Sequence, residues 1–125
     1  MTQLADAATL ARKLLIKSGQ RIIVRHCPDE FVEVFKNLGA AFDRGTIAEI
    51  TLSFVHAQSD VDNACKEAIA LTAPGGMLWM AYPQKGETIT WESFMGAGWQ
   101  PESQINMGAV WSALRFRPKE DSKAR

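Results

Sequence analysis

The sequence has little of several residue types, and each shortage excludes a class of protein. It has two cysteines in 125 residues, which is too few for a disulfide framework, and their separation matches no metal-binding spacing. We expect Cys27 and Cys65 to be reduced residues in or near the core of a cytoplasmic protein. No apolar run is long enough to span a bilayer, and Asp6, Arg12 and Lys13 interrupt any signal-like segment near the first residue.

The sequence also lacks an excess charge of either sign, since 14 Lys and Arg balance 14 Asp and Glu. This balance predicts neither nucleic acid nor an anionic membrane as a partner. The densest basic stretch, Arg115 to Arg125, is interrupted by Glu120 and Asp121, and residues 119–125 are expected to be a disordered tail. Apolar residues are plentiful at 46%, so residues 1–118 are expected to form a single domain around one core.

Hydrophobic periodicity predicts alternating helices and strands. The expected helices are Thr2–Lys17, Pro28–Leu38, Ser59–Leu71 and Trp91–Ala97, and the expected strands are Arg21–Cys27, Ile47–Val55, Met77–Ala81, Glu102–Asn106 and Val110–Arg117. Alternating units impose parallel pairing, and the last two strands form an antiparallel hairpin with Gly108 in its turn. The order therefore predicts an α/β fold, a three-layer, Rossmann-like sandwich with a mainly parallel sheet of about five strands.

Finer expectations concern burial and capping. Met77–Ala81 carries no charge on either face, which predicts a strand at the middle of the sheet, with Trp79 in the core. In Ile47–Val55, apolar residues alternate with Glu49, Thr51 and Ser53, so one face of that strand should be less buried.

Ser59 and Asp62 have the spacing of a capping box, which predicts the start of the third helix. Trp111 shares a strand face with Arg115 and Arg117, so it is expected to be partly exposed, at a ligand cleft or a subunit contact.

Several local features of this order resemble the class I S-adenosylmethionine-dependent methyltransferase fold. The turn Ala73-Pro74-Gly75-Gly76-Met77-Leu78 resembles its helix-to-strand turn, and Ala97-Gly98-Trp99 resembles the step before its closing hairpin. The stretches GGMLWMAYPQKG and NMGAVWSALRFRP are similar to a family of short bacterial proteins catalogued as a domain of unknown function with a methyltransferase-like fold. The resemblance implies a truncated fold, because the segment between Leu38 and Ile47 is too short for two further edge strands.

Seven residues are candidates for ligand binding, because open α/β sheets bind ligands beyond the carboxyl ends of their strands. They are His26, Cys27 and Asp29 after the first strand, His56 after the second, Tyr82 and Lys85 after the third, and Trp111 in the hairpin. The two histidines with Cys27 and Asp29 admit an acid–base pair, a Cys–His couple or a metal site. The alternative, which two histidines without a third ligand favour, is that both imidazoles cap strand ends, so no metal ligand and no catalytic residue is assigned.

Tyr82 and Lys85 have plainer interpretations of the same kind. Lys85 lies beside Gly86 and can contact an anionic ligand, and the Tyr82 hydroxyl can donate a hydrogen bond. Alternatively, the lysine is a solvated loop residue and the tyrosine only ends its strand.

The loop after the first strand lacks the glycines that bring a backbone close to a nucleotide. It reads His26-Cys27-Pro28-Asp29-Glu30, with a proline that has no N–H and two carboxylates over the start of a helix. This arrangement disfavours phosphates but is compatible with the sulfonium of S-adenosylmethionine. We therefore expect no cofactor, with S-adenosylmethionine as the open alternative.

Three functional hypotheses follow. The preferred one is a methyltransferase-like domain without catalysis that binds a small molecule or a protein partner. The second is a minimal S-adenosylmethionine-dependent methyltransferase with its cofactor over His26, Asp29 and His56, and it predicts a concave pocket there. The third is a structural homodimer formed through an exposed sheet edge or the Trp111 face.

Overall fold

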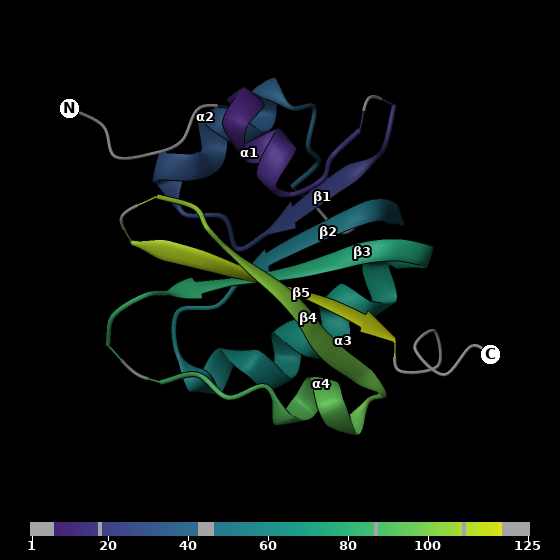
Figure 1. Cartoon of the computed structure of the whole chain (residues 1–125), viewed down its shortest axis with the longest axis vertical. Helices are drawn as coiled ribbons and strands as arrows, with labels where there is room; N and C mark the ends of the chain where they lie inside the picture. Colours follow the sequence, from purple (N-terminus) through teal and green to yellow (C-terminus); the bar gives the residue numbers. More distant parts are fainter. Residues whose placement is uncertain (1–6, 18, 43–46, 87, 109, 119–125) are drawn as a thin grey trace.

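The centre of the molecule is a five-stranded mixed sheet. The computed structural model describes residues 7–17, 19–42, 47–86, 88–108 and 110–118. Its elements are α1 (Ala7–Lys13), β1 (Ile22–Arg25), α2 (Asp29–Asn37), β2 (Ala48–Phe54), the 3-10 turn Gln58–Asp60, α3 (Val61–Leu71), β3 (Thr72–Pro83), α4 (Glu92–Gly96), β4 (Trp99–Asn106) and β5 (Trp111–Pro118). Figure 1 shows α1 and α2 on one face of the sheet and α3 and α4 on the other. The predicted three-layer α/β fold is confirmed.

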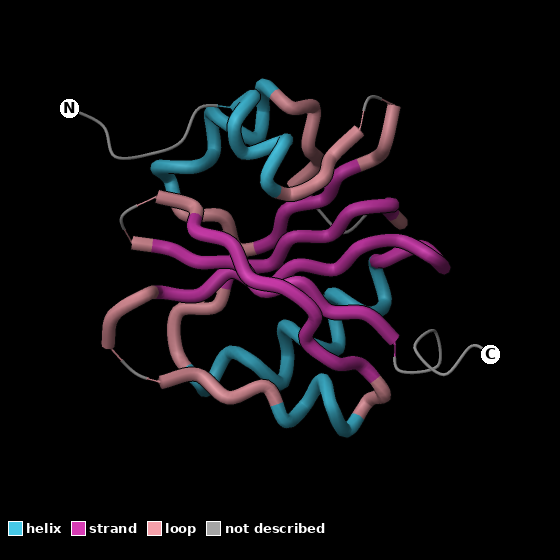
Figure 2. The backbone as a smooth tube through the Cα atoms, in the orientation of Figure 1, coloured by secondary structure: helices cyan, strands magenta, loops and turns pink. Residues whose placement is uncertain are grey.

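The strand order is β1-β2-β3-β5-β4, and it sets which strand ends lie together. β1, β2 and β3 are parallel, with Ile50 opposite both Ile22 and Met77. β5 runs antiparallel to β3 and pairs with β4 on its other side. Figure 2 shows the resulting continuous sheet. The predicted position of Met77–Ala81 at the middle of the sheet is confirmed, and the carboxyl ends of β1 to β3 lie at one edge.

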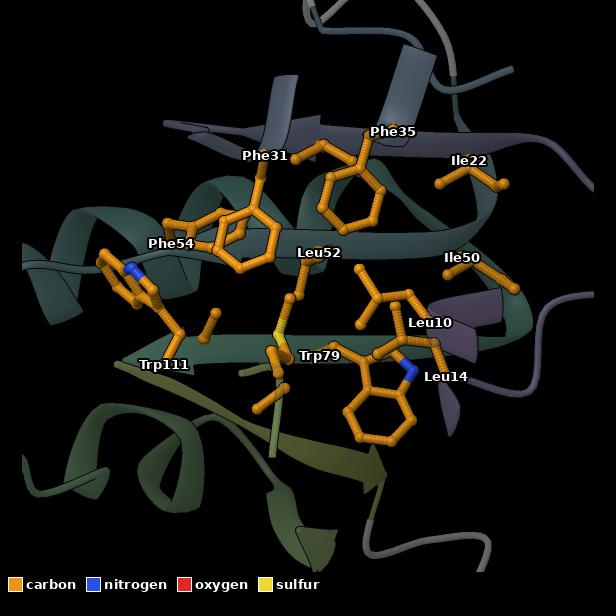
Figure 3. Packing of buried hydrophobic residues seen from close by; sticks show 14 residues of the cluster. Leu10, Leu14, Ile22, Phe31, Phe35, Ile50, Leu52, Phe54, Trp79 and Trp111 are labelled. Carbon is orange, nitrogen blue, oxygen red and sulfur yellow. The ribbon is translucent and has the colours of Figure 1, made fainter. Parts of the chain in front are cut away.

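The middle of β3 is buried on both faces, as its uncharged sequence predicts. Trp79 and Ala81 pack in the cluster under α1 and α2, whereas Leu78 and Met80 pack in the cluster with α3 and α4. Trp79 is 1% exposed. In Figure 3 it lies beside the α1 leucines, across the core from the phenylalanines of α2.

Three phenylalanines tie α2 to β2 at the end of this core. The ring centroid of Phe54 lies 5.5 Å from that of Phe31 and 6.4 Å from that of Phe35. All three side chains are almost fully buried. Phe54 is the last residue of β2, so this aromatic cluster reaches the edge of the sheet where a ligand would bind.

The expectation that one face of β2 would be less buried is wrong for most of the strand. Thr51 and Ser53 are fully buried, and only Glu49 is partly exposed. Thr51 Oγ1 accepts a hydrogen bond of 2.9 Å from Thr72 Oγ1, at the end of α3. Because the polar residues of that face are small, they pack beneath α3, and the alternation in the sequence does not mark an open face.

The predicted capping box at Ser59 is also wrong. Ser59 is exposed, and α3 begins at Val61 after a 3-10 turn. The Asp60 side chain makes no capping hydrogen bond to α3 and instead closes the 3-10 turn, because its Oδ2 accepts the backbone N–H of His56 at 2.9 Å and of Ala57 at 3.3 Å. The carboxylate therefore folds back over the end of β2.

Several predicted boundaries shift. α1 ends at Lys13, because the chain turns at Leu15 with a φ of 63°. β1 ends at Arg25, and Ala41 makes a single parallel bridge with Ile23 at the outer side of β1. β4 begins at Trp99, earlier than predicted.

The described residues do not cover every prediction about the ends of the chain. The start of the first predicted helix and the tail over residues 119–125 lie outside them. In the part of the chain that the structure describes, every helix is too short or too polar to cross a bilayer.

A methyl group at Gly76 is expected to lower the free energy of unfolding by about 1–3 kcal/mol. A Cβ there would lie 2.6 Å from the backbone oxygen of Glu49 and 3.0 Å from that of Ala73, neither of which moves without disturbing β2 or β3. Urea unfolding of Gly76→Ala measures the change. Gly96→Ala is the control, since its Cβ meets nothing within 4 Å, and an equal loss in both variants would contradict the explanation.

Candidate functional site

A cleft opens at the carboxyl ends of β1 and β2. Its volume is about 470 Å³, which is in the size range of small-molecule sites. The residues that line it are His26, Cys27, Phe54, His56, Asp60, Asn63 and Ala64. A second hollow of about 440 Å³ shares His26 and Asn63 with it and adds Lys66 and Glu67. A cleft is therefore present at the strand ends where the second hypothesis requires one, although Asp29 does not line it.

His26 forms the turn that ends β1 and has an uncommon backbone. Its φ is 59°, a left-handed conformation in which residues other than glycine are strained. Its Nε2 lies 3.2 Å from Glu67 Oε1, and the other carboxylate oxygen lies 3.2 Å from Arg25 Nε. Arg25 also donates a hydrogen bond of 2.6 Å from Nη1 to the backbone oxygen of Phe42. Glu67 thus joins α3 to the turn and holds the imidazole at the cleft.

Cys27 lies in the cleft wall as a protonated thiol. Its Sγ donates to the backbone oxygen of Pro28 at 3.4 Å. Burial, together with the negative charges of Glu30 and Asp29, raises the pKa of the thiol to about 11. The nucleophile is the thiolate, so this environment works against the Cys–His couple.

The imidazole ring of His56 packs against the indole ring of Trp111. The two rings meet edge to face with centroids 5.2 Å apart, and Trp111 packs in the same way on Phe54 at 5.1 Å. Trp111 Nε1 donates to Glu30 Oε2 at 3.3 Å. With α2 and the end of β2 covering it, Trp111 is only 5% exposed, and the expectation that it would be partly exposed is wrong.

The remaining candidates lie outside the cleft wall. Tyr82 packs edge to face on Trp91, at 5.6 Å, on the α4 side of the sheet. Burial raises the pKa of its hydroxyl, and a hydrogen bond with Ser112 partly opposes this increase. Asp29 and Lys85 are exposed. The structure therefore brings together His26, Cys27 and His56, with Trp111 behind them.

The residues that the sequence did not single out come mainly from α3. Asp60, Asn63, Ala64 and Glu67 lie around the cleft and its second hollow. Their spacing of three, one and three residues places them on one face of a helix, and this signal becomes useful once α3 is known to lie beside the turn after β1. In the described part of the chain, no three His, Cys, Asp or Glu side chains are grouped closely enough to hold a metal ion.

Comparison with known proteins places the fold. The sequence matches no family model and no curated protein. The "putative type 11 methyltransferase from Sulfolobus solfataricus" superposes with a TM-score of 0.59 at 13% identity, over 94% of each chain. The ribosomal protein L11 methylase from Lactobacillus delbrueckii subsp. bulgaricus gives 0.55 at 8% identity, over 90% of this chain and 77% of that one. The chain has a methyltransferase-like fold.

A third structure with this fold was solved with a ligand. The DhpI–SAH complex superposes with a TM-score of 0.53 at 10% identity, over 89% of this chain and 85% of that chain. Identities this low show the methyltransferase-like fold alone. The resemblance that the sequence predicted is confirmed at that level.

Cys27 is expected to react with a thiol reagent at pH 8 at about one hundredth of the rate of an unfolded cysteine, because a pKa of about 11 instead of 9.0 leaves ~100-fold less thiolate. The rate should then rise with pH up to about pH 11. Labelling of a Cys65→Ala variant isolates Cys27. Adding Glu30→Gln should speed the reaction, whereas adding Glu33→Gln, one turn further along α2, should not. Rapid labelling of the parent at pH 8 would contradict this environment.

Proposed function

We propose that the chain is a minimal S-adenosylmethionine-dependent methyltransferase that holds its cofactor in the cleft beside His26 and His56. The observation that carries the proposal is the position of this 470 Å³ cleft. It lies beyond the carboxyl ends of two adjacent parallel strands, where open α/β sheets bind ligands. The fold is shared with the ribosomal protein L11 methylase, and another structure of this fold, the DhpI complex, was solved with SAH.

The residues of the cleft fit such a ligand. S-adenosylmethionine combines an adenosine, which needs hydrogen-bonding groups and apolar surface, with a cationic sulfonium. The Asn63 amide and the Asp60 carboxylate supply donors and acceptors, Ala64 and the edge of Phe54 supply apolar surface, and Asp60 supplies negative charge. When bound, the cofactor supplies a methyl group on an electrophilic sulfonium.

The contribution of this chain is to bind and orient the cofactor, and α3 provides most of it. The turn after β1 offers few backbone donors, because it has no glycine and Pro28 has no N–H. The α3 side chains at the cleft therefore take the place of a glycine-rich loop. His56, braced by Trp111, closes the opposite wall.

A second candidate is a domain of the same fold that binds a ligand without transferring a methyl group. The observation that favours it is the same turn, His26-Cys27-Pro28, which lacks the glycines of a nucleotide-binding loop. Membership of the short bacterial family of unassigned activity agrees with either candidate and stays a prediction.

Calorimetric titration with S-adenosylmethionine and with SAH tests the proposal. We expect micromolar dissociation constants, weakened about tenfold in Asn63→Ala through the loss of one hydrogen bond. Asn37→Ala, which removes an exposed amide at the end of α2, is the matched control. No heat with either compound at millimolar concentration would overturn the proposal. Binding without SAH formation, when S-adenosylmethionine is incubated with a metabolite extract, would favour the second candidate.

A further inference from the structure

The described wall of the cleft contains a carboxylate but no lysine or arginine. The carboxylate is that of Asp60, and the wall also includes two imidazoles. The Asp60 carboxylate accepts two backbone N–H groups at the end of β2. A ligand carboxylate in this cleft would therefore meet a like charge and no arginine or lysine of the wall.

Two cations close to the cleft in the described chain, Arg25 and Lys66, have carboxylate partners. Arg25 lies 3.2 Å from Glu67 and also donates to the backbone of Phe42. Lys66, at the second hollow, lies 3.7 Å from Asp62 across one turn of α3. Neither Arg25 nor Lys66 lines the main cleft.

The start of α2 also disfavours the binding of an anion. A helix N-terminus attracts anions through its free N–H groups and its dipole, but here Pro28 has no N–H and Asp29 and Glu30 occupy the first turn. Both carboxylates raise the pKa of Cys27, a cleft residue, so their field reaches the wall. Glu30 is exposed and outside the cleft lining, but its Oε2 accepts the indole N–H of Trp111, whose ring packs on His56.

We infer that the cleft selects an adenosyl sulfur compound whose tail carries an amine but no carboxylate, of the decarboxylated S-adenosylmethionine type. This inference rests on the proposed function, because it keeps the cleft and the adenosyl sulfonium, but it names the decarboxylated compound as the ligand that the cleft prefers over S-adenosylmethionine. The α-carboxylate of S-adenosylmethionine would be repelled by Asp60 and Glu30, whereas the amine and the sulfonium would be attracted by them. Selectivity of this kind comes from the repulsive element as much as from the attractive one.

Paired titrations with S-adenosylmethionine and its decarboxylated analogue test the inference, because the two compounds differ only in the carboxylate. We expect the analogue to bind about tenfold more tightly at low salt, as carboxylates a few ångströms away act through a partly desolvated cleft. The ratio should shrink as salt rises from about 0.05 to 0.5 M, since screening weakens the repulsion. Equal affinities, or tighter binding of S-adenosylmethionine itself, would overturn the inference.

Charge-neutral variants identify the source of the selectivity. Glu30→Gln keeps an oxygen to accept the Trp111 N–H, and it should reduce the ratio to about threefold. Glu33→Gln removes an equal charge from the same helix, one turn away, and should leave the ratio unchanged. An unchanged ratio in Glu30→Gln counts against the inference. If neither compound binds the parent protein, the proposed function fails and the inference with it, whereas binding of both with equal affinity removes the inference alone.

Discussion

Replacing Phe54 with alanine is expected to lower the free energy of unfolding by about 3–5 kcal/mol. Its ring is 1% exposed and contacts the rings of Phe31, Phe35 and Trp111. The truncation would leave a void between α2 and the end of β2, too far from solvent to be filled at no cost. Chemical unfolding followed by far-ultraviolet circular dichroism measures the loss.

The same substitution should also disturb the cleft, and this separates it from an ordinary core mutation. Without Phe54, the indole of Trp111 loses one of its two ring contacts and the brace under His56 loosens. The control is Phe94→Ala, since Phe94 is equally buried but stacks on Phe116 in the other cluster. Both variants should be destabilised, and only Phe54→Ala should shift the Trp111 indole N–H resonance.

A milder variant keeps the prediction testable if the alanine variant does not fold. Phe54→Leu preserves most of the volume, and we expect a loss of about 1–2 kcal/mol with a smaller shift of the same resonance. An unshifted Trp111 resonance in a destabilised Phe54 variant would show that the core and the cleft are independent.

The fold was predictable because each βα unit has a recognisable local sequence pattern. The uncharged stretch around Trp79 can only be a central strand, and the β-branched residues before Arg25 and the apolar stripe containing Phe31 and Phe35 fix the first unit. Alternation of such units leaves few topologies. The wrong expectation of a less buried face on β2 also came from a local pattern. Thr51 and Ser53 are polar but small enough to be buried.

The position of the candidate cleft was predictable, but only some of the residues that line it were. The rule for strand ends located His26, Cys27 and His56, since it depends on topology alone. The roles of Trp111 and Glu67 depend on contacts across 81 and 41 residues of sequence. No local pattern marks such contacts, and the side chain that looked exposed beside Arg115 is instead covered by α2.

The Glu67→Gln variant, which removes the charge of Glu67, is expected to lower the free energy of unfolding by about 2–3 kcal/mol. This loss is smaller than the loss expected when one partner of a fully buried ion pair is removed. The side chains of Glu67 and Arg25 are 14% and 20% exposed, so the arginine would be left largely without solvent and without its carboxylate. Urea unfolding measures the loss, with Glu33→Gln as an exposed control expected to change stability by less than about 0.5 kcal/mol.

A second substitution, His26→Gly, measures how much of the stability lost in Glu67→Gln comes from the strained turn at His26. His26 has a left-handed backbone that disfavours a side chain by roughly 1–2 kcal/mol, and the Glu67 contact offsets that strain. In a His26→Gly background the strain and the contact are both absent, so Glu67→Gln should lower stability by about 1 kcal/mol less than in the parent. An equal loss in the two backgrounds would mean that Glu67 serves Arg25 alone. A smaller loss in the His26→Gly background would show that the Glu67 contact offsets the backbone strain at His26. Glycine at that position would need no such contact, so Glu67 is what allows the chain to keep an imidazole in its cleft.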